Sequence, residues 1–175
     1  MSTTLHNTIQ TATASGATAA ETPNVLARDR SAVDWALLAV RVVVGIIFMV
    51  HGAQKVFGLW GGPGLEGVMS AQGPGGGGVV GLLVAIGEFF GGLGLLTGFL
   101  SRFSAAANIL IMVGAIVMVH GKNGFLMSGG GYEYNLALIG LLLPVLIAGP
   151  GRFALGRALP LPRVRGTDRP IPALE

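Results

Sequence analysis

Two ionisable side chains lie inside long apolar stretches of the sequence. Arg41 lies in LLAVRVVVGIIFMVHGAQK, residues 37–55, and Glu88 lies in GEFFGGLGLLTG, residues 87–98. A charged group in an apolar environment needs a partner, and such groups often mark a proton path or a polar ligand site. The two residues therefore indicate proton transfer or ligand binding at a buried ion pair, with a purely structural pin between helices as the alternative.

A second set of polar side chains lies near the ends of the apolar stretches. Its members are His51, Lys55, His120, Tyr132, Glu133 and Tyr134. Nitrogen and hydroxyl groups can donate hydrogen bonds to a ligand, and a carboxylate can accept a proton. The candidate ligand-binding residues are thus Arg41, His51, Lys55, His120, Tyr132 and Tyr134, and the candidate catalytic proton acceptors are Glu88 and Glu133. The alternative for the second set is a belt of amphipathic side chains at a membrane surface.

Membrane-spanning helices must position these residues, because the chain is strongly apolar. Of its 175 residues, 51% are hydrophobic and 11% are charged, and the mean hydropathy is +0.70. A bilayer core about 30 Å thick needs roughly 20 apolar residues per helix. Four stretches qualify, at about Val33–Gly52, Val79–Leu100, Phe103–His120 and Tyr132–Gly149. The predicted fold is all-α, a four-transmembrane-helix bundle with disordered or loosely ordered tails.

The depths of Arg41 and Glu88 in these stretches predict that they pair. Arg41 lies eight residues into the first stretch, and Glu88 lies nine residues into the second, which runs the opposite way. A rise of about 1.5 Å per residue puts both near the middle of the bilayer. The patterns Gly87–Gly91 and Gly94–Gly98 predict close helix packing, with oligomerisation as the second interpretation.

We predict that the chain divides into three parts. Residues 1–31 form a flexible N-terminal tail, residues 32–150 the four-helix transmembrane domain, and residues 151–175 an Arg/Pro-rich C-terminal tail. On the side of the membrane where both tails are predicted to lie, the basic residues are Arg28, Arg30, Arg102, Arg152, Arg157, Arg163, Arg165 and Arg169. On the opposite side they are Lys55 and Lys122. The positive-inside rule therefore places both termini in the cytoplasm.

Several classes of function are disfavoured by the same sequence. The chain has no cysteine, which excludes disulfides and thiolate metal sites. His51, His120 and Glu133 come from separate stretches without tight ligand spacing, so we expect no metal site. Basic residues are not interleaved with aromatic ones, so we expect no nucleic-acid partner.

Several motifs follow one another along the chain in a fixed order. They are RVVVGIIF at residues 41–48, HGAQKVFG at 51–58 with GGPG at 61–64, GEFFGGLGLLTGFLSR at 87–102, HGKNGF at 120–125, GYEYNLAL at 131–138 and GPGRFAL at 149–155. This pattern resembles the DoxX family of small bacterial four-helix integral membrane proteins over about Ala32–Gly156. Many relatives carry Asp after the last motif, where this chain has Gly156.

The resemblance implies a multi-pass protein of the bacterial inner membrane with a redox connection. Members are similar to the small subunit of a thiosulfate:quinone oxidoreductase, and others are associated with quinone or catechol detoxification and oxidative-stress complexes. We therefore expect a component of a membrane oxidoreductase system that handles quinone or small phenolic or sulfur compounds, with quinone as the candidate cofactor. If the chain is catalytic, it is expected to be a quinone-linked oxidoreductase subunit.

Two other functions remain open at this stage. One is a transporter or channel for a small solute or a proton that uses the Arg41–Glu88 pair. The other is a non-catalytic membrane anchor that recruits soluble redox enzymes through the Arg-rich C-terminal tail. Besides the lipid bilayer, a soluble or membrane redox partner and a second copy of the chain are the candidate partners.

Overall fold

The computed structural model describes residues 22–72 and 77–158, and all regular structure in these ranges is helical. The longer helices are α1 (Thr22–Phe57), α3 (Gly78–Thr97), α4 (Ser101–Ala115) and α5 (Glu133–Ala148), and the short ones are α2 (Gly64–Ser70) and α6 (Leu155–Ala158). A π-helical turn, η2 (Ile116–His120), continues α4, and 3-10 turns lie at η1 (Leu59–Gly61), η3 (Gly121–Asn123) and η4 (Met127–Gly129). The predicted all-α class is therefore confirmed.

The chain divides into two units, Met1–Val33 and Asp34–Glu175. In the first unit the structure describes only the start of α1, from Thr22, which lies inside the segment predicted as a tail. The predicted tail residues before Thr22 and after Ala158 lie outside the described residues. The site and its helices belong to the second unit.

Within residues 22–72 and 77–158, three helices are long and apolar enough to cross a membrane. They are Asp29–Phe57, Gly78–Thr97 and Ser101–Asn123, and the last of these combines α4 with the turns that continue it. Helix α5 is equally apolar in character but shorter, with 16 residues. All four coincide with predicted stretches, although the first extends beyond its predicted stretch at both ends.

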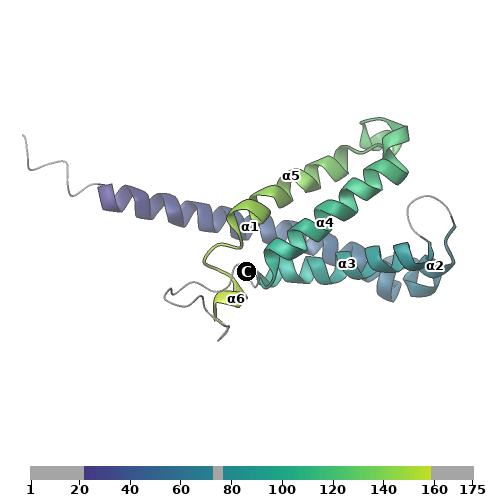
Figure 1. Ribbon diagram of the computed structural model, residues 1–175, viewed down its shortest axis with the longest axis horizontal. Coiled ribbons are helices and arrows are strands. Elements are labelled where there is room, and N and C mark those ends of the chain that lie inside the picture. Colours follow the sequence, from purple (N-terminus) through teal and green to yellow (C-terminus); the bar gives the residue numbers. More distant parts are fainter. Residues whose placement is uncertain (1–21, 73–76, 159–175) are drawn as a thin grey trace, which may run out of the picture. The chain divides into compact units, whose positions relative to one another are not determined.

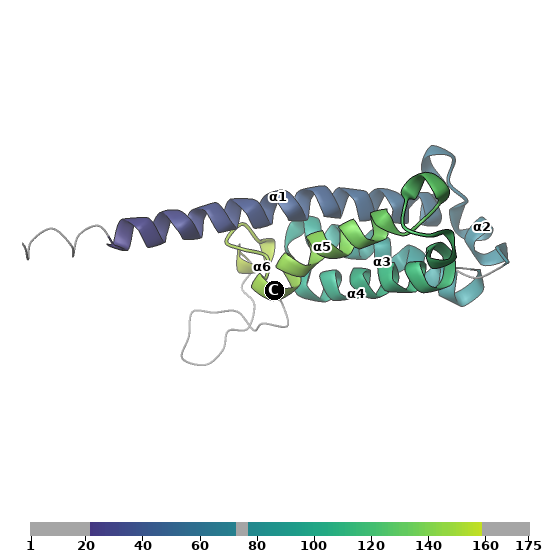
Figure 2. The same cartoon turned by 90° about the horizontal axis from the view of Figure 1, so that it is seen from above.

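Helix α4 packs against α3 on one side and α5 on the other, and α2 packs against α3 (Figures 1 and 2). The tight turn between α3 and α4 includes Gly98 and Leu100, both with positive φ. From this turn, α4 and α5 diverge from α3 in Figure 1. The shared core is formed by Val44, Phe48, Leu95, Ala105, Met112, Leu138, Leu142 and Val145.

Glycines of α3 allow neighbouring helices to approach closely on two sides. A Cβ atom added at Gly92 would lie 2.7 Å from the carbonyl oxygen of Gly45 and 2.9 Å from Cα of Met49, both in α1. A Cβ atom added at Gly91 would overlap the amide of Asn108 in α4. Close packing of helices, which the glycine patterns predict, is thus confirmed within a single chain.

Replacing Gly92 with Ala should destabilise the bundle, because backbone atoms of α1 cannot move away without separating the helices. We expect Gly92→Ala to lower the free energy of unfolding by about 1–3 kcal/mol. Gly140→Ala in α5 is the matched control, since a Cβ there meets nothing within 4 Å and Ala favours a helix more than Gly. Thermal unfolding of both variants in one detergent measures the difference, and equal melting temperatures would contradict the packing described.

Candidate functional site

A cavity of about 540 Å³ lies between α1, α3, α4 and α5, at the end of the bundle where α4 diverges from α3. Its apolar lining comes from Phe48, Val80, Leu83, Val84, Leu110, Ile111, Met112, Ala115, Met118, Val119 and Leu138. Its polar lining comes from His51, Lys55, Glu88, His120, Tyr134 and Asn135. Five of these six polar residues are among the candidates from the sequence, and Asn135 is the addition.

Helix geometry explains how residues distant in sequence meet at this cavity. His51 and Lys55 are four residues apart in α1, so they lie on the same face one turn from each other. Glu88 in α3 faces them from the neighbouring antiparallel helix, and the end of α4 supplies His120. Tyr134 and Asn135 lie in the first turn of α5, where that helix starts beside the end of α4.

The carboxylate of Glu88 is buried, with only 4% of the residue exposed, and it forms an ion pair with the ammonium group of Lys55. A cation beside a buried carboxylate compensates for its lost hydration. The predicted Arg41–Glu88 pair is therefore wrong. The prediction ended the first span at Gly52, but α1 continues as a helix to Phe57, and this extension brings Lys55 alongside α3.

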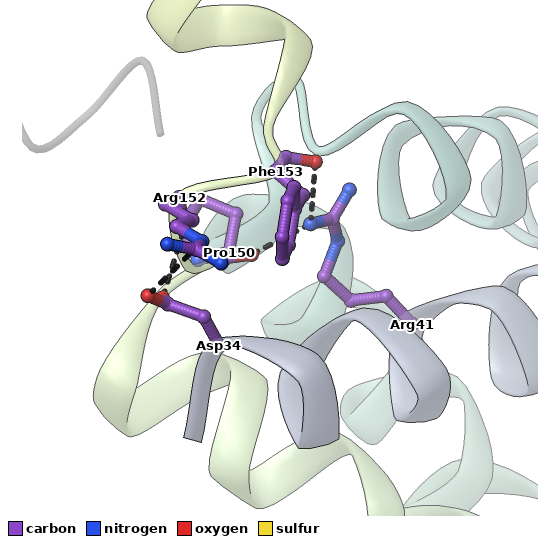
Figure 3. A network of polar contacts seen from close by, with 5 residues as sticks. All are labelled: Asp34, Arg41, Pro150, Arg152 and Phe153. Atoms are coloured by element: carbon purple, nitrogen blue, oxygen red, sulfur yellow. Dashed lines mark hydrogen bonds and ion pairs between the residues drawn. The ribbon is translucent and has the colours of Figure 1, made fainter. Parts of the chain in front are cut away.

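Arg41 lies away from the cavity, in a polar network at the opposite end of the bundle (Figure 3). It is fully buried, and its guanidinium donates to four backbone carbonyl oxygens. These are Leu95 (2.9 Å), Leu96 (3.1 Å), Pro150 (2.6 Å) and Phe153 (3.2 Å). The last carbonyls of a helix have no partner further along it and carry partial negative charge. Arg41 therefore caps α3 and ties the segment after α5 to it.

Further contacts hold that same segment against α1 (Figure 3). Asp34 accepts a hydrogen bond of 2.9 Å from the backbone N–H of Arg152, and its second oxygen lies 3.8 Å from Arg152 Nε. The ring of Phe153 lies 4.5 Å from that of Trp35. Asp34 is not among the residues predicted from the sequence, because an acidic residue near the start of an apolar stretch is common at a membrane surface.

Two of the candidate residues support a loop and do not line the cavity. Glu133 Oε2 accepts a hydrogen bond of 3.0 Å from the backbone N–H of Met127, and Tyr132 packs its ring edge-on against Phe125 at 5.5 Å. Both contacts hold the connection between α4 and α5. Of His51, His120 and Glu133, the structure thus brings the two histidines to one cavity and assigns the carboxylate to the loop.

No group of three or more His, Cys, Asp or Glu residues in the described part of the chain is arranged to hold a metal ion. The polar atoms at the cavity are instead hydrogen-bond donors and acceptors around an apolar interior. Such a site can bind an organic molecule that has a flat apolar body and polar oxygen atoms at its edge.

Comparison with known proteins identifies one family. The model of the DoxX family matches residues 36–121, which include α2, α3 and α4 and much of α1. This match confirms the family that the sequence motifs predict. Comparisons with curated proteins and with solved structures give no match.

Double-mutant cycles should show that Glu88 interacts with Lys55 and not with Arg41, the partner that the sequence suggested. We expect a coupling energy of about 1–3 kcal/mol between Lys55→Gln and Glu88→Gln, since each removes the other's partner. Arg41→Gln and Glu88→Gln share no partner, so their effects on unfolding should add to within about 0.5 kcal/mol. Denaturation of single and double variants in the same detergent measures both terms. Strong coupling of Arg41 to Glu88 would contradict the assigned partners.

Proposed function

Because residues 36–121 carry a DoxX domain, we propose that this membrane protein binds a quinone or a related small phenolic compound within a membrane oxidoreductase system. The observation that carries the proposal is the cavity itself, which combines apolar walls with the Lys55–Glu88 pair, two histidines and a tyrosine. Its volume of about 540 Å³ lies within the usual range of small-molecule sites, roughly 300–1,000 Å³.

The chemistry of the polar groups matches a ligand with oxygen atoms at its ring. Lys55 carries three N–H donors, and its bond to Glu88 Oε2 uses one of them. The hydroxyl of Tyr134 and the rings of His51 and His120 can donate or accept. Glu88 is the carboxylate at the cavity and is the proposed proton acceptor, while Arg41, Tyr132 and Glu133 are proposed to support the structure around it.

The cavity walls favour a ligand that reaches the site through the membrane. Leu83 of α3 is 64% exposed and Leu110 of α4 is 73% exposed, although both line the cavity. A residue that is exposed on the outside of a spanning helix and also lines a cavity marks a place where the cavity meets the lipid phase. A lipid-soluble ring compound can enter there between α3 and α4 without crossing the aqueous loops.

The structure lends less support to one of the other two functions. A transporter or channel was expected to use an Arg41–Glu88 pair, but the two side chains have separate partners. A membrane anchor was expected to act through the Arg-rich C-terminal tail, most of which lies outside the described residues. We therefore retain ligand binding as the proposed function.

Filling the cavity should block binding while leaving the helices in place. A Cβ added at Gly114, which lines the cavity, meets nothing within 4 Å, and the same holds at Gly140, which does not line it. We expect Gly114→Phe to weaken binding of a decyl-substituted benzoquinone at least about tenfold, or 1.4 kcal/mol, and Gly140→Phe to bind like the original protein. Equilibrium binding in lipid nanodiscs measures this. Unchanged affinity in Gly114→Phe would remove the cavity as the ligand site.

We further propose that α5 is a fourth span and that both termini lie in the cytoplasm of a bacterial cell. Helix α5 packs along α4, which is long enough to cross with its continuing turns. Its 16 residues extend about 24 Å, and local thinning of the bilayer accommodates a short span at modest cost. The excess of Arg on the side of the termini supports the orientation.

A reporter fused after Glu175 should therefore read cytoplasmic, because four crossings return the chain to its starting side. A second reporter inserted near Gly75 should read external. An external reading at Glu175 together with an external reading at Gly75 would mean that α5 does not cross. Inverted readings at both positions would overturn the orientation alone.

A further inference from the structure

His120 makes one hydrogen bond that fixes which of its ring nitrogens carries the proton. The residue ends the π-helical turn η2, and its Nδ1 lies 2.8 Å from the carbonyl oxygen of Gly130. A carbonyl oxygen can only accept a hydrogen bond, so Nδ1 must carry the hydrogen. In the neutral ring, Nε2 then has no hydrogen and presents a lone pair.

The Gly130 carbonyl that sets this tautomer is itself held in place by the loop. It also accepts a hydrogen bond of 3.1 Å from Asn123 Nδ2. The neighbouring backbone is tied by bonds from Gly131 N–H to Leu126 O (3.0 Å) and from Tyr132 N–H to Gly124 O (3.1 Å). A ring flip of His120 would therefore break its bond to a carbonyl that cannot follow it.

His120 lines the cavity as well as contacting the loop through Nδ1, which leaves Nε2 as the ring nitrogen that can bond to a ligand. The other polar groups of the cavity include both donors and acceptors, because the His51 ring and the Tyr134 hydroxyl can act as either. Lys55 can only donate, and Glu88 Oε2 is engaged by Lys55. The amide nitrogen of Asn135 donates to the sulfur of Met112 at 3.4 Å. His120, whose Nε2 is an acceptor in this tautomer, thus lines a cavity that also holds a cationic donor.

The two oxidation states of a quinone-type ligand differ in how they satisfy this arrangement. The carbonyl oxygens of a quinone only accept, so they can pair with Lys55 but leave His120 Nε2 without a hydrogen. One hydroxyl of a hydroquinone can donate to His120 Nε2, while the oxygen of its other hydroxyl accepts from Lys55. An acceptor covered by ligand and left without a donor weakens binding.

We infer that His120 is a specificity-determining residue that makes the cavity prefer the hydroxyl-bearing, reduced form of its ligand, a hydroquinone or a simple phenol. The inference rests on the proposed function and narrows its ligand class. The preference expected from one unpaired acceptor is at least about tenfold in affinity.

The tautomer can be measured directly by ¹⁵N NMR of the histidine rings in detergent or nanodiscs. The chain contains three histidines, His6, His51 and His120, so single replacements assign each signal. At mildly alkaline pH, where an unperturbed imidazole is neutral, His120 should give the signals of an Nδ1-protonated ring. An Nε2-protonated or doubly protonated ring would overturn the inference without affecting the proposed cavity.

The preference is tested by binding a decyl-substituted benzoquinone and the corresponding hydroquinone to the full chain in nanodiscs. The hydroquinone is kept reduced by dithionite, which cannot alter disulfides because the chain has no cysteine. The unmodified protein should bind the hydroquinone at least about tenfold more tightly than the quinone. His120→Asn places an amide nitrogen near the Nδ1 position and has no group at Nε2, so the ratio should fall towards one. His120→Gln places its amide near Nε2 and should retain more of the ratio.

The outcomes separate the two proposals. Equal affinity for both forms, a preference for the quinone, or a ratio unchanged in His120→Asn would overturn the role of His120 while leaving the cavity as the binding site. If the unmodified protein binds neither form, both the proposed function and this inference fail. If His120→Asn does not fold, the tautomer measurement and the ratio in the unmodified protein still decide the question.

Discussion

The hydrogen bonds from Arg41 to four backbone carbonyls are the interaction on which the rest of the bundle depends. They pair carbonyl oxygens at the end of α3 and after the end of α5 with one guanidinium from α1. Within an apolar environment these carbonyls have no water to bind, so leaving them unpaired would be costly. Because one side chain joins three segments at one end, α4 and α5 can diverge from α3 towards the other end and leave room for a cavity.

Buried Arg41 and partly exposed Lys55 are compensated in different ways, and this difference gives them different roles. Arg41 has rigid planar donors that match several fixed carbonyls at once, so its contacts define a single arrangement of the backbone. Lys55 has a flexible stem and a compact charge, and its partner Glu88 is a side chain that lines the cavity. The Lys55–Glu88 ion pair joins two side chains beside a cavity, so it can exchange a hydrogen bond within the pair for one to a ligand. The Arg41 contacts cannot change in this way without leaving backbone carbonyls at the helix ends unpaired.

The sequence predicted the fold class, the family and the places of the longer helices, because hydrophobic length and motif order are local signals. It also named five of the six polar residues at the cavity. It paired Arg41 with Glu88 because charge and depth were the only guides, and backbone carbonyls at helix ends do not show in a sequence. Glu133 was predicted as a proton acceptor, and nothing in the sequence indicated that its carboxylate accepts a hydrogen bond from the backbone N–H of Met127 in an irregular loop.

The placement of His120 shows how structure at a helix end becomes chemistry at a site. Helix α4 changes to a π-helical turn before His120, and such turns are frequent at functional sites because they redirect side chains. The altered turn brings Nδ1 of the ring to the loop carbonyl at Gly130 while the residue still lines the cavity. The loop that looks peripheral in sequence therefore determines whether the cavity offers a donor or an acceptor to its ligand.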